Sequence, residues 1–130
     1  MARMHEIVFD CRHPASIARF WVAALDDYEI APYDQAELQR LQSLGIDDVE
    51  DDPTVRIHGP GRQPGVLFQR VAEPRTVKNR VHIDLRCESF ETELLRLREL
   101  GASVLAEYDT FVVLSDPEGN EFCLSRRANG

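Results

Sequence analysis

A twofold repetition of one order of elements is the feature that most restricts how this chain can fold. Each half opens with a strand and a histidine near its start, as "HEIVFDC" from His5 and "HIDLRC" from His82. In both halves the spacing of apolar residues then predicts a helix, followed by three strands. The repetition indicates a duplicated strand–helix–three-strand unit. We therefore expect a single domain over residues 1–130, with one module over about residues 1–75 and another over about residues 76–130.

The elements of the first module are predicted from apolar spacing and turn residues. Residues 4–10 form the expected first strand, and Pro14 suits the first turn of a helix that buries Trp21. A short strand at "YEIAPY" and a short helix that ends at Gly45 should follow, and "TVRIH" and "VLFQRV" should complete the module. The acidic run "IDDVEDDP" favours a solvated loop, with a lid over a cationic substrate as the alternative.

The second module begins with a strand that has two different faces. Because side chains alternate along a strand, residues 78–87 present an apolar face and a polar face. The apolar face consists of Val81, Ile83 and Leu85, and the polar face consists of His82, Asp84 and Arg86. A helix that ends at Gly101 should follow, then strands at "ASVLAEY" and "TFVVLS". The sequence "DPEG" predicts a type I turn before the last strand, "NEFCLSR".

Composition excludes several classes of protein. Hydrophobic residues make up 43% of the chain and charged residues 29%, which is typical of a globular protein. No apolar run approaches the roughly 20 residues that a membrane-spanning helix needs. The net charge of −8 argues against nucleic acid and anionic membranes as partners. The three cysteines form no CxxC pair and are expected to be reduced, and without a signal sequence we expect a cytoplasmic protein.

Three stretches of the sequence carry a resemblance to a known superfamily. They are "HEIVFDCRHPASIARFW", "VLFQRVAEPRTVKNRVHIDL" and "FVVLSDPEGNEFCL", and they resemble the vicinal oxygen chelate superfamily of glyoxalase I, extradiol dioxygenases, and bleomycin and fosfomycin resistance proteins. The chain is most similar to its glyoxalase-like domain subgroup. The resemblance implies an α+β fold in which two βαβββ modules form a curled mixed sheet around a central cavity, with the helices outside. It also implies a homodimer.

The resemblance also implies which residues face the cavity. They should come from the first strand (His5, Ile7, Phe9), the fourth (Leu67, Gln69, Val71), the fifth (His82, Asp84, Arg86) and the last (Glu121, Cys123, Ser125). We expect the ligand-binding residues among them to be His5, Gln69, His82, Asp84, Glu121 and Cys123. If the protein is an enzyme, His82 and Glu121 are the candidates for acid–base catalysis.

A metal ion is not expected from this set. Metal enzymes of the superfamily bind a divalent ion through residues of four strands, and the matching positions here are His5, Gln69, His82 and Cys123. Cys123 stands where the superfamily has a carboxylate, and a thiol between apolar neighbours is typically protonated and inert. We therefore expect no cofactor; a divalent metal, if one binds, should use these four residues.

The expected function is the binding of a small organic molecule in a partly polar cavity. The residues leave open whether the protein is also an enzyme of lyase, isomerase or dioxygenase type with an unassigned substrate. The alternative is a protein that binds or sequesters a drug without converting it, as the resemblance to bleomycin resistance proteins implies.

Overall fold

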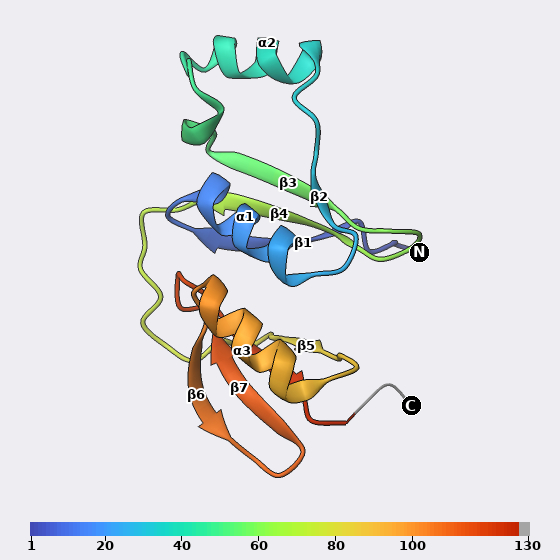
Figure 1. The fold of residues 1–130 in the computed structure, drawn as a ribbon. Coiled ribbons are helices and arrows are strands. Elements are labelled where there is room, and N and C mark those ends of the chain that lie inside the picture. The colour runs from blue at the N-terminus through green and yellow to red at the C-terminus, as the bar shows by residue number, and fades with distance from the viewer. Residues whose placement is uncertain (128–130) are drawn as a thin grey trace. The chain divides into compact units, whose positions relative to one another are not determined.

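The computed structural model describes residues 1–127 and divides the chain into two compact units, Met1–Glu73 and a second unit that starts at Pro74. Each unit contains one four-stranded mixed sheet with a helix packed on it (Figure 1). The predicted α+β class and the repeated βαβββ order are confirmed. Among the described residues, no helix combines the length and the apolar character needed to cross a membrane.

The first unit adds a helical insertion to the βαβββ order. Its elements are β1 (Glu6–Cys11), α1 (Pro14–Ala24), β2 (Glu29–Ile30), α2 (Gln35–Ser43), the short 3-10 helix η1 (Val49–Asp51), β3 (Thr54–His58) and β4 (Gly65–Arg70). The strands are arranged in the order β1-β4-β3-β2. The first strand pairs in parallel with the last, and the other neighbours are antiparallel. The helices α2 and η1 form the insertion between β2 and β3.

The core of the first unit lies between α1 and the sheet. Pro14 occupies the first turn of α1, where its missing N–H is not needed. Trp21 is fully buried, as predicted, and meets Phe9 of β1 edge to face with 5.6 Å between ring centroids. Phe9 in turn meets Phe68 of β4 at 5.3 Å. Edge-to-face contacts of this kind add to the stabilisation from burial.

The orientation of β1 that the resemblance implied, with Phe9 facing a cavity, is wrong. Phe9 packs on Trp21, so α1 covers the face of β1 that carries Phe9. We call the opposite face of each sheet its open face. Strand alternation places three residues of β1 on that face, namely Glu6, Val8 and Asp10.

The acidic run is not simply a solvated loop, because its last acidic residue, Asp52, is buried. The side chain of Asp52 is only 1% exposed. It accepts hydrogen bonds from the Tyr33 hydroxyl (2.7 Å), from both terminal nitrogens of Arg40 (2.8 and 3.2 Å) and from the Thr54 N–H (3.0 Å). The residues before Asp52, from Asp47 to Asp51, are exposed as predicted. Asp52 therefore ties α2 to the start of β3.

The second unit has the βαβββ order without an insertion. Its elements are β5 (Ile83–Leu85), α3 (Phe90–Leu100), β6 (Ser103–Glu107), β7 (Phe111–Ser115) and β8 (Glu121–Ser125), and the strands are arranged in the order β5-β8-β7-β6. As in the first unit, the first and last strands are parallel neighbours. This pairing places Asp84 directly beside Cys123.

Local signals in the second unit are largely confirmed. Helix α3 ends at Gly101, whose φ of +120° is unfavourable for residues with a side chain. The N–H of Gly119 donates to the carbonyl of Asp116 at 2.9 Å, which closes the predicted turn. Leu97 of α3 and Phe122 and Leu124 of β8 are fully buried and form the centre of this core.

The first strand of this unit is shorter than predicted. It covers three residues rather than ten, and Val81, which belongs to the apolar face predicted for this strand, is 79% exposed. Ile83 and Leu85 are half-buried. The prediction for Val81 is therefore wrong, because the stretch before β5 does not continue the ladder with β8.

Candidate functional site

Three of the predicted ligand-binding residues come together on the open face of the second sheet. His82 lies directly before β5, and Asp84 lies within it, two residues further on and on the same face. Cys123 lies beside Asp84 on β8. Its neighbours Phe122 and Leu124 point to the other face and are buried in the core. The parallel pairing of β5 with β8 thus creates a cluster of one imidazole, one carboxylate and one thiol.

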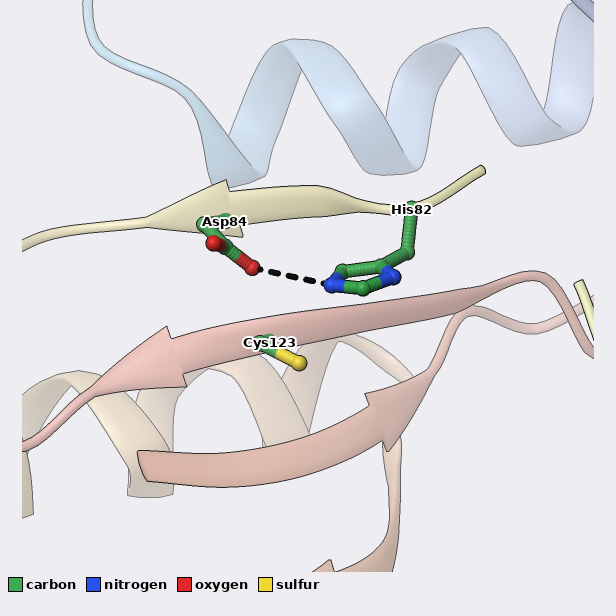
Figure 2. Close-up of side chains that lie close together, drawn as sticks. All are labelled: His82, Asp84 and Cys123. Atoms are coloured by element: carbon green, nitrogen blue, oxygen red, sulfur yellow. Dashed lines mark ion pairs between the residues drawn. The ribbon is translucent and has the colours of Figure 1, made fainter. Parts of the chain in front are cut away.

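The three side chains are close enough to act on one bound group. The Nε2 atom of His82 lies 3.3 Å from Oδ1 of Asp84. The nearest ligand atoms of His82, Asp84 and Cys123 all lie within 4.8 Å of one another (Figure 2). The side chains of His82 and Asp84 are 43% and 75% exposed, whereas Cys123 is buried. The cluster therefore has a buried sulfur with two polar groups toward solvent.

Burial keeps the thiol of Cys123 protonated in the free protein. It raises the pKa of Cys123, and the negative charge of Asp84 and a hydrogen bond to that carboxylate raise it further. A thiol in this state is a poor nucleophile. The cluster is thus not a ready-made cysteine catalytic site, although a metal ion could displace the proton.

Glu121, a predicted acid–base candidate, is held in place by hydrogen bonds and ion pairs with its neighbours. Its side chain is 11% exposed and accepts a hydrogen bond from the N–H of Asn79 (3.2 Å), while the N–H of Glu121 donates to the side-chain oxygen of Asn79 (3.3 Å). Arg75 and Lys78 lie 3.3 and 3.5 Å from its carboxylate. The Asn79 hydrogen bond and the two positive charges lower the pKa of Glu121. Its carboxylate is therefore ionised and already bound by Asn79, Arg75 and Lys78. A carboxylate whose pKa is lowered in this way is a weak base, so Glu121 does not suit the role of a general base.

His5 and Gln69 belong to the first unit. His5 is exposed and lies before the start of β1. Gln69 lies on the open face of the first sheet, opposite Asp10 in the register, and its amide donates to that carboxylate at 2.8 Å.

An ion pair on the same open face was missed by sequence reasoning. Arg56 of β3 donates two hydrogen bonds to the carboxylate of Glu6, at 2.7 and 3.1 Å. These hydrogen bonds lower the pKa of Glu6. The signal that could have found the pair is strand alternation, which puts Glu6 rather than His5 on the face of Asp10.

Only one group of His, Cys, Asp and Glu side chains within residues 1–127 is arranged to hold a metal ion, and it is the cluster of His82, Asp84 and Cys123. Nitrogen, oxygen and sulfur donors of this kind suit a divalent ion such as Zn²⁺. Asp84 supplies the anionic oxygen that the predicted set of His5, Gln69, His82 and Cys123 lacks. The donor set therefore fits a divalent metal better than the sequence indicated.

A separate hollow of about 380 Å³ lies in the second unit, where strands β6 and β8 end. It is lined by Glu107, Tyr108, Asp109 and Arg126. Arg126 also stacks over the Phe90 ring, with 4.5 Å from its guanidinium carbon to the ring centroid. Since Arg126 is already engaged there and with the carbonyl of Tyr108, we assign no function to this hollow.

Comparison with known proteins identifies relatives of the whole chain. The model of the glyoxalase-like domain family matches residues 6–125. No curated protein matches. Among solved structures, a mutant of the fosfomycin resistance protein FosX from Listeria monocytogenes, complexed with Mn(II) and 1S,2S-dihydroxypropylphosphonic acid, is similar at 10% identity and a TM-score of 0.65, over 96% of this chain and 90% of that chain.

Two further solved structures show the same likeness. A glyoxalase/bleomycin resistance protein/dioxygenase family enzyme from Burkholderia phytofirmans PsJN has 14% identity and a TM-score of 0.65, over 95% of this chain and 97% of that chain. A member of the same superfamily from Sphaerobacter thermophilus has 19% identity and a TM-score of 0.61, over 96% and 97%. At such identities the structures show a shared fold, and the family model covers nearly all of the sequence. The chain therefore belongs to the glyoxalase-like domain family.

Proposed function

We propose that this protein binds a small organic molecule on the open face of its second sheet, in contact with His82, Asp84 and Cys123. The observation that carries the proposal is the grouping of these three side chains within 4.8 Å. The helix-covered face of the sheet is filled by apolar residues such as Phe122 and Leu124. Polar groups gathered on the opposite face are therefore available to recognise a ligand.

The charges at the cluster favour a ligand that brings a positive group or a hydrogen-bond donor to Asp84. Among the described residues Asp84 has no ion pair with a lysine or arginine, and the Nε2 atom of His82 lies 3.3 Å from its carboxylate. The nearby carboxylate of Glu121, in contrast, is already offset by Arg75 and Lys78. The net charge of −8 also favours a cationic ligand.

A ligand screen on the full chain tests this proposal. Thermal unfolding should be measured with amines, quaternary ammonium compounds, catechols and phosphonates, fosfomycin included, because a ligand of the folded state raises the melting temperature. Each hit is then titrated calorimetrically into wild type, Asp84→Asn and His82→Ala. The matched control is Asp109→Asn, which changes an exposed aspartate of the same unit outside the cluster.

We expect a hit whose affinity falls at least about tenfold, or 1.4 kcal/mol, in Asp84→Asn and is unchanged in Asp109→Asn. A hit that binds Asp84→Asn and His82→Ala as tightly as wild type would place the binding site elsewhere. The absence of any stabilising compound across all four classes would also contradict the proposal. Titration of His5→Ala and Gln69→Ala tests separately whether these two residues contribute, as the resemblance implies.

Catalysis is the second candidate function, and the donor set of the cluster favours it. A divalent metal held by His82, Asp84 and Cys123 would polarise an oxygen of the bound compound. The structure of FosX with Mn(II) shows that a protein of this fold can combine a metal with a small ligand. Incubating each hit with the protein and the metal, and following the mixture by mass spectrometry, separates the functions: a converted compound indicates a lyase, isomerase or dioxygenase-type enzyme, and an unchanged one indicates binding or drug sequestration.

A further inference from the structure

The second unit contains a complete set of ligands for one metal ion, independently of the first unit. We propose that His82, Asp84 and Cys123 form a zinc site, and that the thiol makes this site prefer Zn(II) to the Mn(II) found with FosX. The set differs from the four-strand set expected from the superfamily, because it uses two strands and takes its carboxylate from Asp84. Gln69 has no part in it.

Geometry is the first argument. The two residues on the β5 side point to one face, and Cys123 lies beside Asp84 in the parallel register. Ligand atoms within 4.8 Å of one another need to approach by only about 1 Å to reach the spacing of donors around one zinc ion. His82 and Asp84 are exposed side chains, so they can make this adjustment by rotating. Figure 2 shows the three side chains converging from β5 and β8.

The chemistry of the donors is the second argument. Thiolate sulfur is a soft ligand that favours zinc, whereas manganese prefers oxygen donors. Three protein ligands, with two of them on the solvent side, leave a position open for water or a substrate oxygen, as in catalytic zinc sites.

The charge of Asp84 is the third argument. The partly buried carboxylates of Glu6 and Glu121 are paired with arginine or lysine. Among the described residues, Asp84 has no lysine or arginine partner, and its carboxylate faces the His82 imidazole at 3.3 Å. No lysine or arginine therefore competes with a cation for this carboxylate, and the imidazole and thiol beside it can also coordinate.

Metal titrations of the chelator-treated full chain test the proposal without any organic ligand. Calorimetry with Zn(II) alone and Mn(II) alone gives stoichiometry and affinity, and absorption spectra with Co(II) report a thiolate-to-cobalt charge-transfer band. The variants are Cys123→Ser, Asp84→Asn and His82→Gln. The controls are Cys87→Ser, which removes another cysteine of the same unit, and Gln69→Ala, which removes the amide of the four-strand set.

We expect one Zn(II) per chain, bound at least about 100-fold more tightly than Mn(II). Cys123→Ser should abolish the charge-transfer band, and each of the three variants should weaken Zn(II) binding at least about tenfold. Both controls should bind Zn(II) within about twofold of wild type and keep the band. If Cys123→Ser does not fold, Asp84→Asn and His82→Gln decide the question, since they change exposed side chains.

Three results would overturn the proposal. They are loss of the band in Cys87→Ser, weakening of Zn(II) binding in Gln69→Ala as large as in Asp84→Asn, and binding of Mn(II) as tight as Zn(II). The zinc site rests on the same residues as the proposed organic-ligand site, but different results contradict the two proposals. Zinc binding without any organic hit would contradict only the proposed function, and an Asp84-dependent organic hit without zinc binding would contradict only the zinc site.

Discussion

The Asp52→Asn substitution should destabilise the first unit by about 2–3 kcal/mol at neutral pH. It removes a buried negative charge while changing the shape of the side chain very little. Wild-type Asp52 binds Arg40 through both terminal nitrogens and also accepts from the Tyr33 hydroxyl and the Thr54 N–H. In the variant, an amide nitrogen replaces one carboxylate oxygen. Because this nitrogen is a donor, it cannot accept the hydrogen bonds that the replaced oxygen accepted.

The magnitude follows from how far each partner is buried. Removing one member of a fully buried ion pair typically destabilises by about 3–5 kcal/mol, because the other charge stays buried without a partner. Arg40 is 31% exposed, and its Nε lies 2.8 Å from the carboxylate of Glu37, so it keeps part of its solvation and one ion pair. We therefore expect the smaller destabilisation of about 2–3 kcal/mol. Loss of the hydrogen bond from Tyr33 accounts for about 1 kcal/mol of it.

The effect should depend on pH in a defined direction. Burial alone would raise the pKa of Asp52, but the hydrogen bonds from Arg40, Thr54 and Tyr33 outweigh it and lower the pKa from its ordinary value. A carboxyl whose pKa is lowered by folding stabilises above its unfolded pKa, and this stabilisation is lost as the pH falls through the folded value. The difference between wild type and Asp52→Asn should thus be constant between about pH 5 and pH 8, and shrink below about pH 4.

Urea unfolding followed by tryptophan fluorescence measures the effect, since Trp21 is the single tryptophan and lies in the first unit. Asp51→Asn is the matched control, because Asp51 is an exposed neighbour and its change should stay within about 0.5 kcal/mol. If Asp52→Asn also stays within that range, or if the difference between it and wild type grows as the pH falls, the assigned role of the network is wrong.

Four further predictions concern other parts of the chain. Glu121→Gln should loosen the segment around Asn79, seen as faster amide hydrogen exchange there, because the carboxylate that binds this segment is gone. Cys123→Glu should restore the carboxylate of the superfamily and strengthen Mn(II) binding at least about tenfold by calorimetry. Gly101→Ala should destabilise by about 1–2 kcal/mol in urea unfolding, because φ is +120° and a Cβ would lie 3.1 Å from Pro117 Cγ. Light scattering should show a homodimer, which would cover edge strands such as β2 and β6; a monomer at high micromolar concentration would contradict it.

The order of the elements could be predicted because its signals are local. Pro14 at the start of α1, Gly101 at the end of α3 and the turn closed by Gly119 each act through the backbone of a few neighbouring residues. Helical spacing of apolar residues is likewise readable within one segment. These features needed no knowledge of distant partners.

The errors arose where the decisive contact is distant in sequence. The run Ile7–Val8–Phe9 is apolar on both faces of the strand, so only the contact of Phe9 with Trp21 shows which face meets the helix. Asp52 looks like part of a solvated acidic run until Tyr33 and Arg40 are placed beside it.

The candidate site was predicted in part for the same reason. His82 and Asp84 share a face by simple alternation along one strand. That Cys123 lies beside Asp84 depends on the parallel register of β5 with β8, which no local pattern specifies. The sequence therefore indicated the residues but not that Asp84 could replace the missing carboxylate in a metal-binding set.

The parallel pairing of β5 with β8 also has a consequence for when the site comes into existence. Helix α3 and strands β6 and β7 lie between these strands in the chain, so a ribosome must synthesise the whole second unit before Cys123 can reach Asp84. A nascent chain that ends before β8 carries the imidazole and the carboxylate but no thiol neighbour. Any ion or molecule held by all three groups would thus select chains whose last strand has docked, and would slow their unfolding during the first moments after release.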